Sequence, residues 1–303
     1  MNIKSIPNLD ESVKTGLDFF IKNKITALKI KKLPFCFIVG SVNAFNTGKI
    51  MFSGRQAVFA DESNFKEILK TYQPLIKNKI IKEAIIISAS GEKDSIWEIK
   101  AAQKAGLKTT LLTCNKNSTA AGLADKNFFY KKTAEAYSYN FSTYLGMILS
   151  ITGENPETIK KFINKVRPPK NLKKYSFFTF ILPDNFEPIA SMINVKDDEL
   201  FGPYSSMRAY TEGKARHAKF ICQSEKELVI SFGKNSYFGL EKNRWEINLP
   251  TMAKSGLILS LSYYLVGLIQ TIKPHYFKNG LADYCLKTGP KPYKQKKPFS
   301  IIG

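Results

Sequence analysis

The sequence predicts an α/β protein of two halves, each built on a parallel sheet, with the second half less complete than the first. Short apolar runs that end in small residues alternate with amphipathic stretches from residue 34 to residue 152. A similar alternation begins again after residues 167–174, a basic break that contains two prolines. Alternating strands and helices are typical of doubly wound sheets with helices on both faces. We therefore expect one domain over residues 1–165 and a second over residues 166–303.

The first half is predicted to contain four strands with connecting helices. An amphipathic helix at residues 9–27 comes first, with Val13, Leu17, Phe20 and Ile25 near one face. The apolar run PFCFIVG then ends in glycine, as expected of a central parallel strand. The four strands are expected at residues 34–40, 56–61, 83–90 and 108–115, and further helices are expected to start near Ser41 and to cover residues 64–78, 94–105 and 134–152.

The second half repeats this order with one helix missing. Its strands are expected at residues 175–182, 217–222, 227–233 and 245–250, with a helix at residues 204–216 and none after the third strand. Ser255–Ile272 carries no charge, and its length is at the lower limit for spanning a bilayer, which takes about 20 residues. Its hydroxyl side chains and its glutamine favour a buried core helix instead. The tail from residue 273 to residue 303 is predicted to be an irregular surface strap.

The composition indicates a globular protein without a metal centre. Of the 303 residues, 44% are hydrophobic and 13% are aromatic. The four cysteines include no C-x-x-C pair, and no histidine lies at ligand spacing. This pattern argues against a zinc site and a disulfide scaffold and fits a reduced compartment. Because the N-terminal residues show no signal-peptide pattern, we expect a cytoplasmic protein with neither metal nor cofactor.

The formal net charge of +21 predicts an attraction to anions, from small phosphates to nucleic acid or acidic lipid. The lysines are spread along the chain, and many fit the solvated faces of helices. No recognised nucleic-acid-binding module accompanies them. The sequence therefore favours neither a nucleic acid nor a membrane as the partner, although an anion-binding role based on this charge stays an alternative.

The loop after the third predicted strand gathers hydroxyl groups at a helix start. Ser88, Ser90 and Ser95 can donate hydroxyl hydrogen bonds, and Gly91 lets the backbone approach a ligand closely. A helix N-terminus also offers unpaired N–H groups and a partial positive potential to a phosphate. An ordinary N-cap at residue 94 or 95 explains one hydroxyl but not the cluster.

Ser41 occupies the same kind of position after the first predicted strand. The ends of strands one and three can lie side by side in a doubly wound sheet, and ligands bind at that edge. Two hydroxyl-bearing loops would then face one anion. This pair of loops predicts a phosphate site.

The pattern Ser88-x-Ser90-Gly91-Glu92, followed by Asp94-Ser95, resembles the sugar isomerase (SIS) domain family. The resemblance continues through a helix that ends in Lys-x-Gly and covers the first half to about residue 153. It implies a flavodoxin-like fold, often duplicated, that binds phosphosugars, and a dimer whose site includes residues from the partner. Further matching positions are Gly106, Thr113, Asn115, Ser118, Leu123, Ala124 and Asp125.

Two residues of the first half have alternative interpretations. Lys93 stands where the family often has threonine, in a loop one residue shorter; it is either a phosphate counter-ion or a solvated side chain. Glu135 lies at the start of the helix predicted for residues 134–152. It either binds a sugar hydroxyl or amine or is a helix-start charge favoured by the dipole.

The second half resembles the C-terminal SIS domain of glucosamine-6-phosphate synthase more faintly, in the stretch MRAYTEGKARHAKF. The resemblance places Glu212 at the family's catalytic glutamate, which moves a proton between C1 and C2 of the opened sugar, and His217 at its His-Ala position. Alternatively, Glu212 is an exposed helix charge. His217 is expected to support packing or a subunit contact more than catalysis.

Together these features predict a phosphosugar aldose–ketose isomerase, or a related deglycase, acting on a hexose or amino-sugar 6-phosphate. The His-Gly-Pro loop that opens the sugar ring in the resembling enzymes has no counterpart, since SFGKN stands in its place and the other histidine is His275. A non-catalytic phosphosugar-binding or sensing protein is therefore the alternative. Resemblance implies a homodimer in either case.

Overall fold

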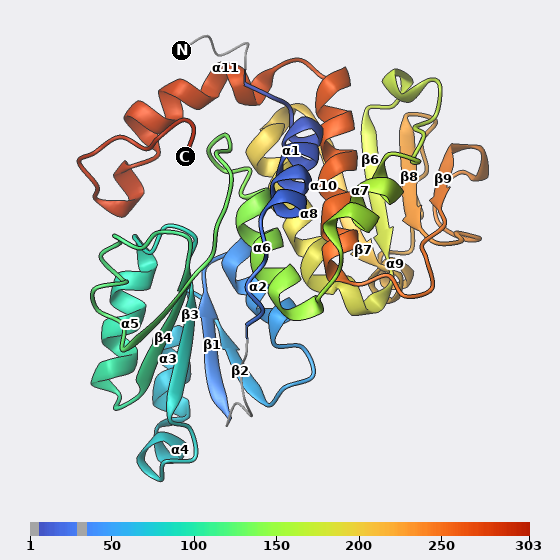
Figure 1. The fold of residues 1–303 in the computed structure, drawn as a ribbon. Coiled ribbons are helices and arrows are strands. Elements are labelled where there is room, and N and C mark those ends of the chain that lie inside the picture. The colour runs from blue at the N-terminus through green and yellow to red at the C-terminus, as the bar shows by residue number, and fades with distance from the viewer. Residues whose placement is uncertain (1–5, 29–34) are drawn as a thin grey trace. The chain divides into compact units, whose positions relative to one another are not determined.

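The computed structural model describes residues 6–28 and 35–303, which form two compact units. Within these residues, unit 1 contains the chain up to Lys22, Ala134–Phe141 and Glu154–Gly303, and unit 2 contains Asn23–Thr133 and Ser142–Gly153. The strands are β1 (Cys36–Gly40), β2 (Ala57–Ala60), β3 (Glu83–Ile87), β4 (Lys108–Thr113), β5 (Lys126–Phe129), β6 (Phe177–Leu182), β7 (Ser206–Thr211), β8 (Glu227–Phe232) and β9 (Arg244–Ile247) (Figure 1). The helices are α1 (Leu9–Lys22), α2 (Asn43–Met51), α3 (Phe65–Thr71), α4 (Gln73–Lys77), α5 (Asp94–Lys104), α6 (Phe141–Thr152), α7 (Pro156–Ile163), α8 (Glu187–Leu200), α9 (Glu212–Ala218), α10 (Ser255–Ile272) and α11 (Tyr276–Asp283).

Unit 2 has a five-stranded parallel sheet in the order β2-β1-β3-β4-β5, which is the flavodoxin-like order. All five residues of β1 are buried, as expected for a strand covered on both faces. Phe37 and Ile86 pack on one face with Phe65 of α3 and Ile99 of α5. The four predicted strands are confirmed. β5 was not predicted; it is a four-residue edge strand whose Lys126 and Phe129 are exposed and whose apolar residues are Phe128 and Phe129 only.

Unit 1 has a four-stranded parallel sheet in the order β7-β6-β8-β9. This order repeats that of β2, β1, β3 and β4. In the described stretch between β8 and β9, a single turn of 3₁₀ helix stands where α5 stands in unit 2, so the predicted missing helix is confirmed. Two parallel-sheet halves, the second less complete, are therefore present, while the boundary between residues 165 and 166 stays a prediction.

The second strand of unit 1 was predicted at the wrong place. Residues 204–216 were predicted to be helical and residues 217–222 to be a strand, but β7 occupies 206–211 and α9 follows it. Met207, Ala209 and Thr211 are buried and alternate with more exposed residues, which is the period of a strand. β7 lies at the sheet edge, where only one neighbour supplies hydrogen bonds. The helix that precedes it, α8, was not predicted at all.

Helix α10 is the apolar helix predicted for Ser255–Ile272. It is long and apolar enough to cross a membrane by length and composition, yet 78% of that span is buried inside the structure. Its Gln270 accepts a hydrogen bond from the Leu9 N–H of α1 at 2.8 Å. A Cβ on Gly267 would come within 2.6 Å of Asp10 Cα, so the glycine permits α1 and α10 to pack at close range. These contacts are those of a core helix.

The chain around residue 135 is not helical as predicted, since α6 begins at Phe141. Ser138 and Asn140 adopt positive φ angles of 72° and 50°, which interrupt a helix. Instead, the backbones of Glu135 and Gly303 exchange two hydrogen bonds of 3.1 and 3.0 Å. The C-terminal tail, predicted to be irregular, contains α11 and a short π-helical turn after it.

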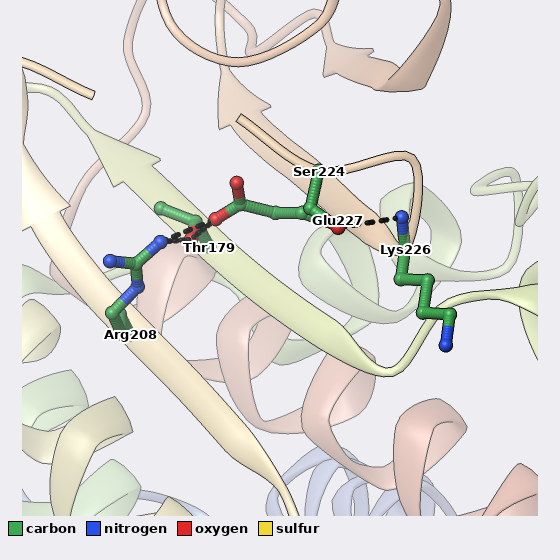
Figure 2. Close-up of polar contacts among 5 residues, drawn as sticks. All are labelled: Thr179, Arg208, Ser224, Lys226 and Glu227. Atoms are coloured by element: carbon green, nitrogen blue, oxygen red, sulfur yellow. Dashed lines mark hydrogen bonds and ion pairs between the residues drawn. The ribbon is translucent and has the colours of Figure 1, made fainter. Parts of the chain in front are cut away.

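A buried carboxylate joins three strands at the amino end of the sheet of unit 1. Figure 2 shows Glu227, the first residue of β8, directed across β6 toward Arg208 of β7. Glu227 Oε1 accepts hydrogen bonds from Thr179 Oγ1 at 2.6 Å and from Arg208 Nη2 at 2.5 Å. The Ser224 hydroxyl accepts the Lys226 N–H at 3.1 Å in the turn that leads into the strand. This network satisfies a carboxylate whose side chain is only 6% exposed.

Glu227→Gln is expected to lower the free energy of unfolding by about 1–2 kcal/mol, because charge-assisted hydrogen bonds become neutral ones while Arg208 stays partly solvated. Urea denaturation measures the loss. Glu225→Gln is the matched control, since Glu225 pairs with Lys242 at 2.7 Å while both side chains are about two-thirds exposed, and its change is expected to be close to zero. Equal losses from the two variants would contradict the role assigned to Glu227.

Candidate functional site

The two serine loops leave the sheet of unit 2 at its topological switch point. β1 and β3 are neighbours, and their last register pair is Gly40 with Ile87. Ser41 and Ser88 are the next residues of the two strands, so both follow the same edge of the sheet. Both side chains are half-buried. Ligands of open α/β sheets bind at such an edge, so the predicted adjacency of the two strand ends is present.

The loop between β3 and α5 orders its own hydroxyl groups. The Gly91 N–H donates to Ser88 Oγ at 3.1 Å, and the Glu92 N–H donates to Ser90 Oγ at 3.3 Å. Each of these hydroxyls therefore uses a lone pair within the loop and keeps its O–H as a donor toward an anion. Ser95 differs, because it is 2% exposed and its hydroxyl donates to the Glu92 carbonyl at 2.8 Å. Its O–H is occupied by this bond, whereas the hydroxyls of Ser88 and Ser90 act only as acceptors within the loop.

The chain after β4 braces this loop. Thr113 Oγ1 donates to the Ala89 carbonyl at 3.2 Å, and Asn115 Nδ2 donates to the Ser90 carbonyl at 3.2 Å. The Thr119 N–H donates to Glu92 Oε1 at 2.9 Å. Positions 113 and 115, matched by the family resemblance, therefore hold the loop in place through its carbonyl groups.

Gly91 is required by both backbone conformation and space. Its φ is +65°, and a Cβ built on it would lie 2.5 Å from Ser118 Cβ and closer still to Ser118 Oγ. Its carbonyl accepts the Ala120 N–H at 3.0 Å. The sequence indicated a glycine for close backbone approach, and the structure shows that the approaching group is the Ser118 side chain.

The helices that follow the two loops begin alike. Val42, the N-cap of α2, has φ 48° and ψ −106°, and Lys93, the N-cap of α5, has φ 58° and ψ −123°. A β-branched residue at positive φ is strained, and such strain clusters at functional sites. Neither valine nor lysine has a side-chain acceptor, so neither N-cap residue caps the first N–H groups of its helix. Lys93 is thus placed at the helix start that would face an anion, and the N-cap of α2 is Val42 rather than Ser41.

Asn43 is a site residue that the sequence interpretation missed. It is the first residue of α2, is 5% exposed, and its Oδ1 has no hydrogen-bond partner among the described residues. A buried amide oxygen of this kind is costly unless a ligand or water satisfies it. A polar residue two positions after Ser41, at the start of the expected helix, was the available signal.

The other predicted site residues belong to unit 1, whereas the serine loops belong to unit 2. Glu135 is 6% exposed and lies in an extended segment, so its expected place at a helix start is wrong. Glu212 is exposed and is the first residue of α9, directly after β7. His217 is exposed in the last turn of α9 and does not pack into the core.

Glu212 lies among charged residues at the carboxyl ends of β6 and β7. Asp184 Oδ1 accepts the Gly213 N–H at 2.7 Å, and this bond, with a further one from Thr211, holds the pKa of Asp184 below its ordinary value. Lys214 forms an ion pair with Glu187 at 2.7 Å. The Lys214 ammonium is thus paired with Glu187, and the exposed Glu212 side chain is accessible to solvent.

The fold and the loops together define a protein of two parallel-sheet α/β units, in one of which two serine-bearing loops follow neighbouring strand ends at the topological switch point. No family model and no curated protein matches the sequence. Among solved structures, glucosamine-6-phosphate deaminase from Thermotoga maritima is 16% identical, with 87% of this chain and 92% of that chain covered and a TM-score of 0.57.

Two further structures show the same likeness. The C-terminal domain of glucosamine-fructose-6-phosphate aminotransferase from Francisella tularensis is 13% identical, covers 88% of this chain and 93% of its own, and has a TM-score of 0.61. Tagatose-6-phosphate ketose/aldose isomerase from Escherichia coli is 11% identical, with 87% and 86% covered and a TM-score of 0.54. The chain therefore has the fold of these phosphosugar enzymes, as its sequence predicted.

Proposed function

We propose that the protein binds a hexose or amino-sugar 6-phosphate and interconverts its aldose and ketose forms. The observation that carries this proposal is the pair of serine loops at the β1/β3 switch point. The phosphate accepts hydrogen bonds from Ser41, Ser88 and Ser90 and from the first turns of α2 and α5. The names of the similar structures, which are phosphosugar enzymes, support the substrate class.

In this proposal Glu212 carries the proton between C1 and C2 of the opened sugar. Glu212 is exposed and directly follows a strand, so its carboxylate is accessible to a substrate as the group that accepts and returns the proton. The reaction needs no external oxidant or reductant: the C2–H proton moves to C1 while the C2 hydroxyl proton moves to the C1 oxygen, so that C2 is oxidised to the carbonyl as C1 is reduced to the alcohol. We further propose that the protein is a homodimer, as the resemblance implies. We also propose a cytoplasmic location, which agrees with the scattered, unpaired cysteines of the sequence.

Ser88→Ala is expected to weaken sugar-phosphate binding about 10- to 100-fold, because a hydrogen bond to a charged group is lost. A thermal-shift screen over a panel of sugar 6-phosphates measures this, since a ligand that binds the native state raises the melting temperature. Ser53→Ala is the control, because the Ser53 hydroxyl donates to the Ile50 carbonyl beyond the far end of α2. An unchanged shift in the Ser88 variant would contradict the phosphate site.

Glu212→Gln is expected to lower turnover about 10²- to 10⁴-fold while leaving the binding-induced thermal shift intact. Deuterium uptake from D₂O into the sugar at C1 and C2 reports the proton transfer. Glu241→Gln, another exposed glutamate of unit 1, is the control and should keep full exchange.

A non-catalytic phosphosugar sensor is the second candidate. The resembling enzymes open the sugar ring with a His-Gly-Pro loop, and neither of the two histidines of this sequence lies in that pattern. Wild-type protein that binds a sugar phosphate but exchanges no deuterium would select this alternative. Binding lost in Ser88→Ala would still support the site in that case.

A further inference from the structure

Unit 1 contains a cavity outside the site described above. Its volume is about 460 Å³, and it lies between the loop Pro168–Lys174 and the last turns of α10. Small-molecule sites in proteins have volumes of about 300–1,000 Å³. The cavity therefore has the size of a ligand site, and nothing in the proposed isomerase reaction uses it.

The floor of the cavity is apolar. Leu172 of the loop is 7% exposed, and Leu268 and Ile272 of α10 line the cavity with it. Thr271, the hydroxyl residue of that wall, donates its O–H to the Leu268 carbonyl at 2.6 Å. The hydroxyl is thereby engaged, so this surface offers contact area to a hydrocarbon or aromatic body.

The rim of the cavity is basic. Lys170, Lys173 and Lys174 line it and are exposed, and none of its ten described lining residues is acidic. In the part of the chain that the structure describes, none of the three forms an ion pair with a carboxylate. Lys174 instead lies 4.6 Å from the centre of the Tyr175 ring. The C-terminal end of α10 carries about half a negative charge, which is much smaller than three positive ones.

A fourth lysine follows the cavity wall directly. Lys273 is next to Ile272 in the chain, and its Nζ donates to the Tyr175 carbonyl at 3.4 Å. Burial away from water lowers its pKa. An anion in the cavity would supply a negative charge close to these lysines, which the residues lining the cavity do not provide.

The loop that carries the three rim lysines is ordered by its own backbone. Pro168 and Pro169 restrict the chain at its start, the Leu172 N–H donates to the Pro169 carbonyl at 3.2 Å, and the Lys174 N–H donates to the Asn171 carbonyl at 3.0 Å. A loop held in this way gives up less conformational freedom when a ligand binds.

We propose that this cavity binds a small organic anion with an apolar body. The acidic group lies among Lys170, Lys173 and Lys174, and the apolar body rests on Leu268 and Ile272. Two sources share this chemistry: an acyl carboxylate and a nucleoside phosphate.

Lysine footprinting of the full chain tests the site directly. The protein is acetylated with acetic anhydride in the presence of decanoate, butyrate, adenosine monophosphate or inorganic phosphate, and modification is read by mass spectrometry at each lysine. Decanoate is expected to protect the three rim lysines better than butyrate, because each fully buried methylene strengthens binding roughly fourfold. Inorganic phosphate, which has no apolar body, should protect them least.

Equilibrium dialysis with labelled decanoate at physiological salt gives the affinity. The triple variant K170Q/K173Q/K174Q is expected to bind at least about tenfold more weakly, since three charged contacts are lost. K291Q/K294Q/K296Q removes the same charge from exposed lysines of the tail and should leave the affinity unchanged. This control separates a site from a general attraction of a basic protein for anions.

If adenosine monophosphate protects the three rim lysines and decanoate does not, the cavity is still an organic-anion site, and its ligand is a nucleotide. Equal weakening in the two triple variants would overturn the proposal. So would protection of the rim lysines by inorganic phosphate to the same degree as by both organic anions, or an absence of protection by either organic anion.

Discussion

Replacing Gly91 by alanine is expected to abolish sugar-phosphate binding and to lower the free energy of unfolding by about 2–4 kcal/mol. An alanine there would adopt a φ of +65° and place its Cβ 2.5 Å from Ser118 Cβ. The residue cannot move away freely, because its N–H donates to Ser88 Oγ and its carbonyl accepts from Ala120. Relief of the clash therefore shifts either the serine loop or the chain that braces it.

Gly106→Ala is the matched control for this prediction. Gly106 follows the other end of α5 with a φ of +90°, yet a Cβ there would meet nothing within 4 Å. The control has the same kind of backbone strain without the clash, so it should cost about 1 kcal/mol and keep binding. Urea denaturation and the thermal shift with a sugar 6-phosphate measure both effects. Retained binding in Gly91→Ala would show that the loop tolerates displacement and does not form the phosphate site.

Glu98→Gln is expected to stabilise the protein in alkaline solution. Glu98 of α5 is 1% exposed, and its Oε1 has no hydrogen-bond partner among the described residues. Burial, followed by the charges of Asp94, Glu62 and Asp61, raises its pKa from 4.5 to about 8. The folded protein therefore holds a proton on this carboxyl where the unfolded chain has released it.

The sign of the pH effect follows from this raised pKa. Between about pH 4.5 and pH 8 the folded state binds more protons than the unfolded state, so stability falls as the pH rises, by at most about 1.4 kcal/mol per pH unit for this group. Below pH 4.5 both states are protonated and the cost of ionisation is absent. Gln cannot ionise, so the variant should be about 1–3 kcal/mol more stable than wild type at pH 8 and nearly equal to it at pH 4.

Urea denaturation at pH 4 and at pH 8 measures this difference. Glu67→Gln, in the neighbouring helix α3, is the control, because its side chain is 77% exposed and pairs with Lys70 on the surface. It should change stability by less than about 0.5 kcal/mol at both pH values. A Glu98 variant that is less stable than wild type at pH 8 would mean that the carboxyl has a favourable partner in the folded state.

The sequence alone was sufficient for the features that depend on neighbouring residues. Strands β1 and β3 contain continuous apolar runs that are buried on both faces, and such runs are recognisable without knowledge of their partners. Ser88, Ser90 and Gly91 could be assigned to one loop because a strand end, a positive-φ turn and a helix start follow each other within ten residues. The ends of helix α10 could be predicted because Lys254 and Lys273 flank an uncharged segment.

Only the tertiary structure decided the features that depend on distant residues. The segment MRAYT is a strand because it pairs with β6 and its alternate side chains are buried. In the sequence this alternation is not apparent, because the residues around it are polar. Glu135 is extended because its backbone pairs with Gly303, far away in the chain. Ser95 and Ser90 look equivalent in the sequence, but burial ties the Ser95 hydroxyl to a carbonyl. Local order follows from chain-neighbour chemistry, while pairing and burial depend on which distant segments the fold brings into contact.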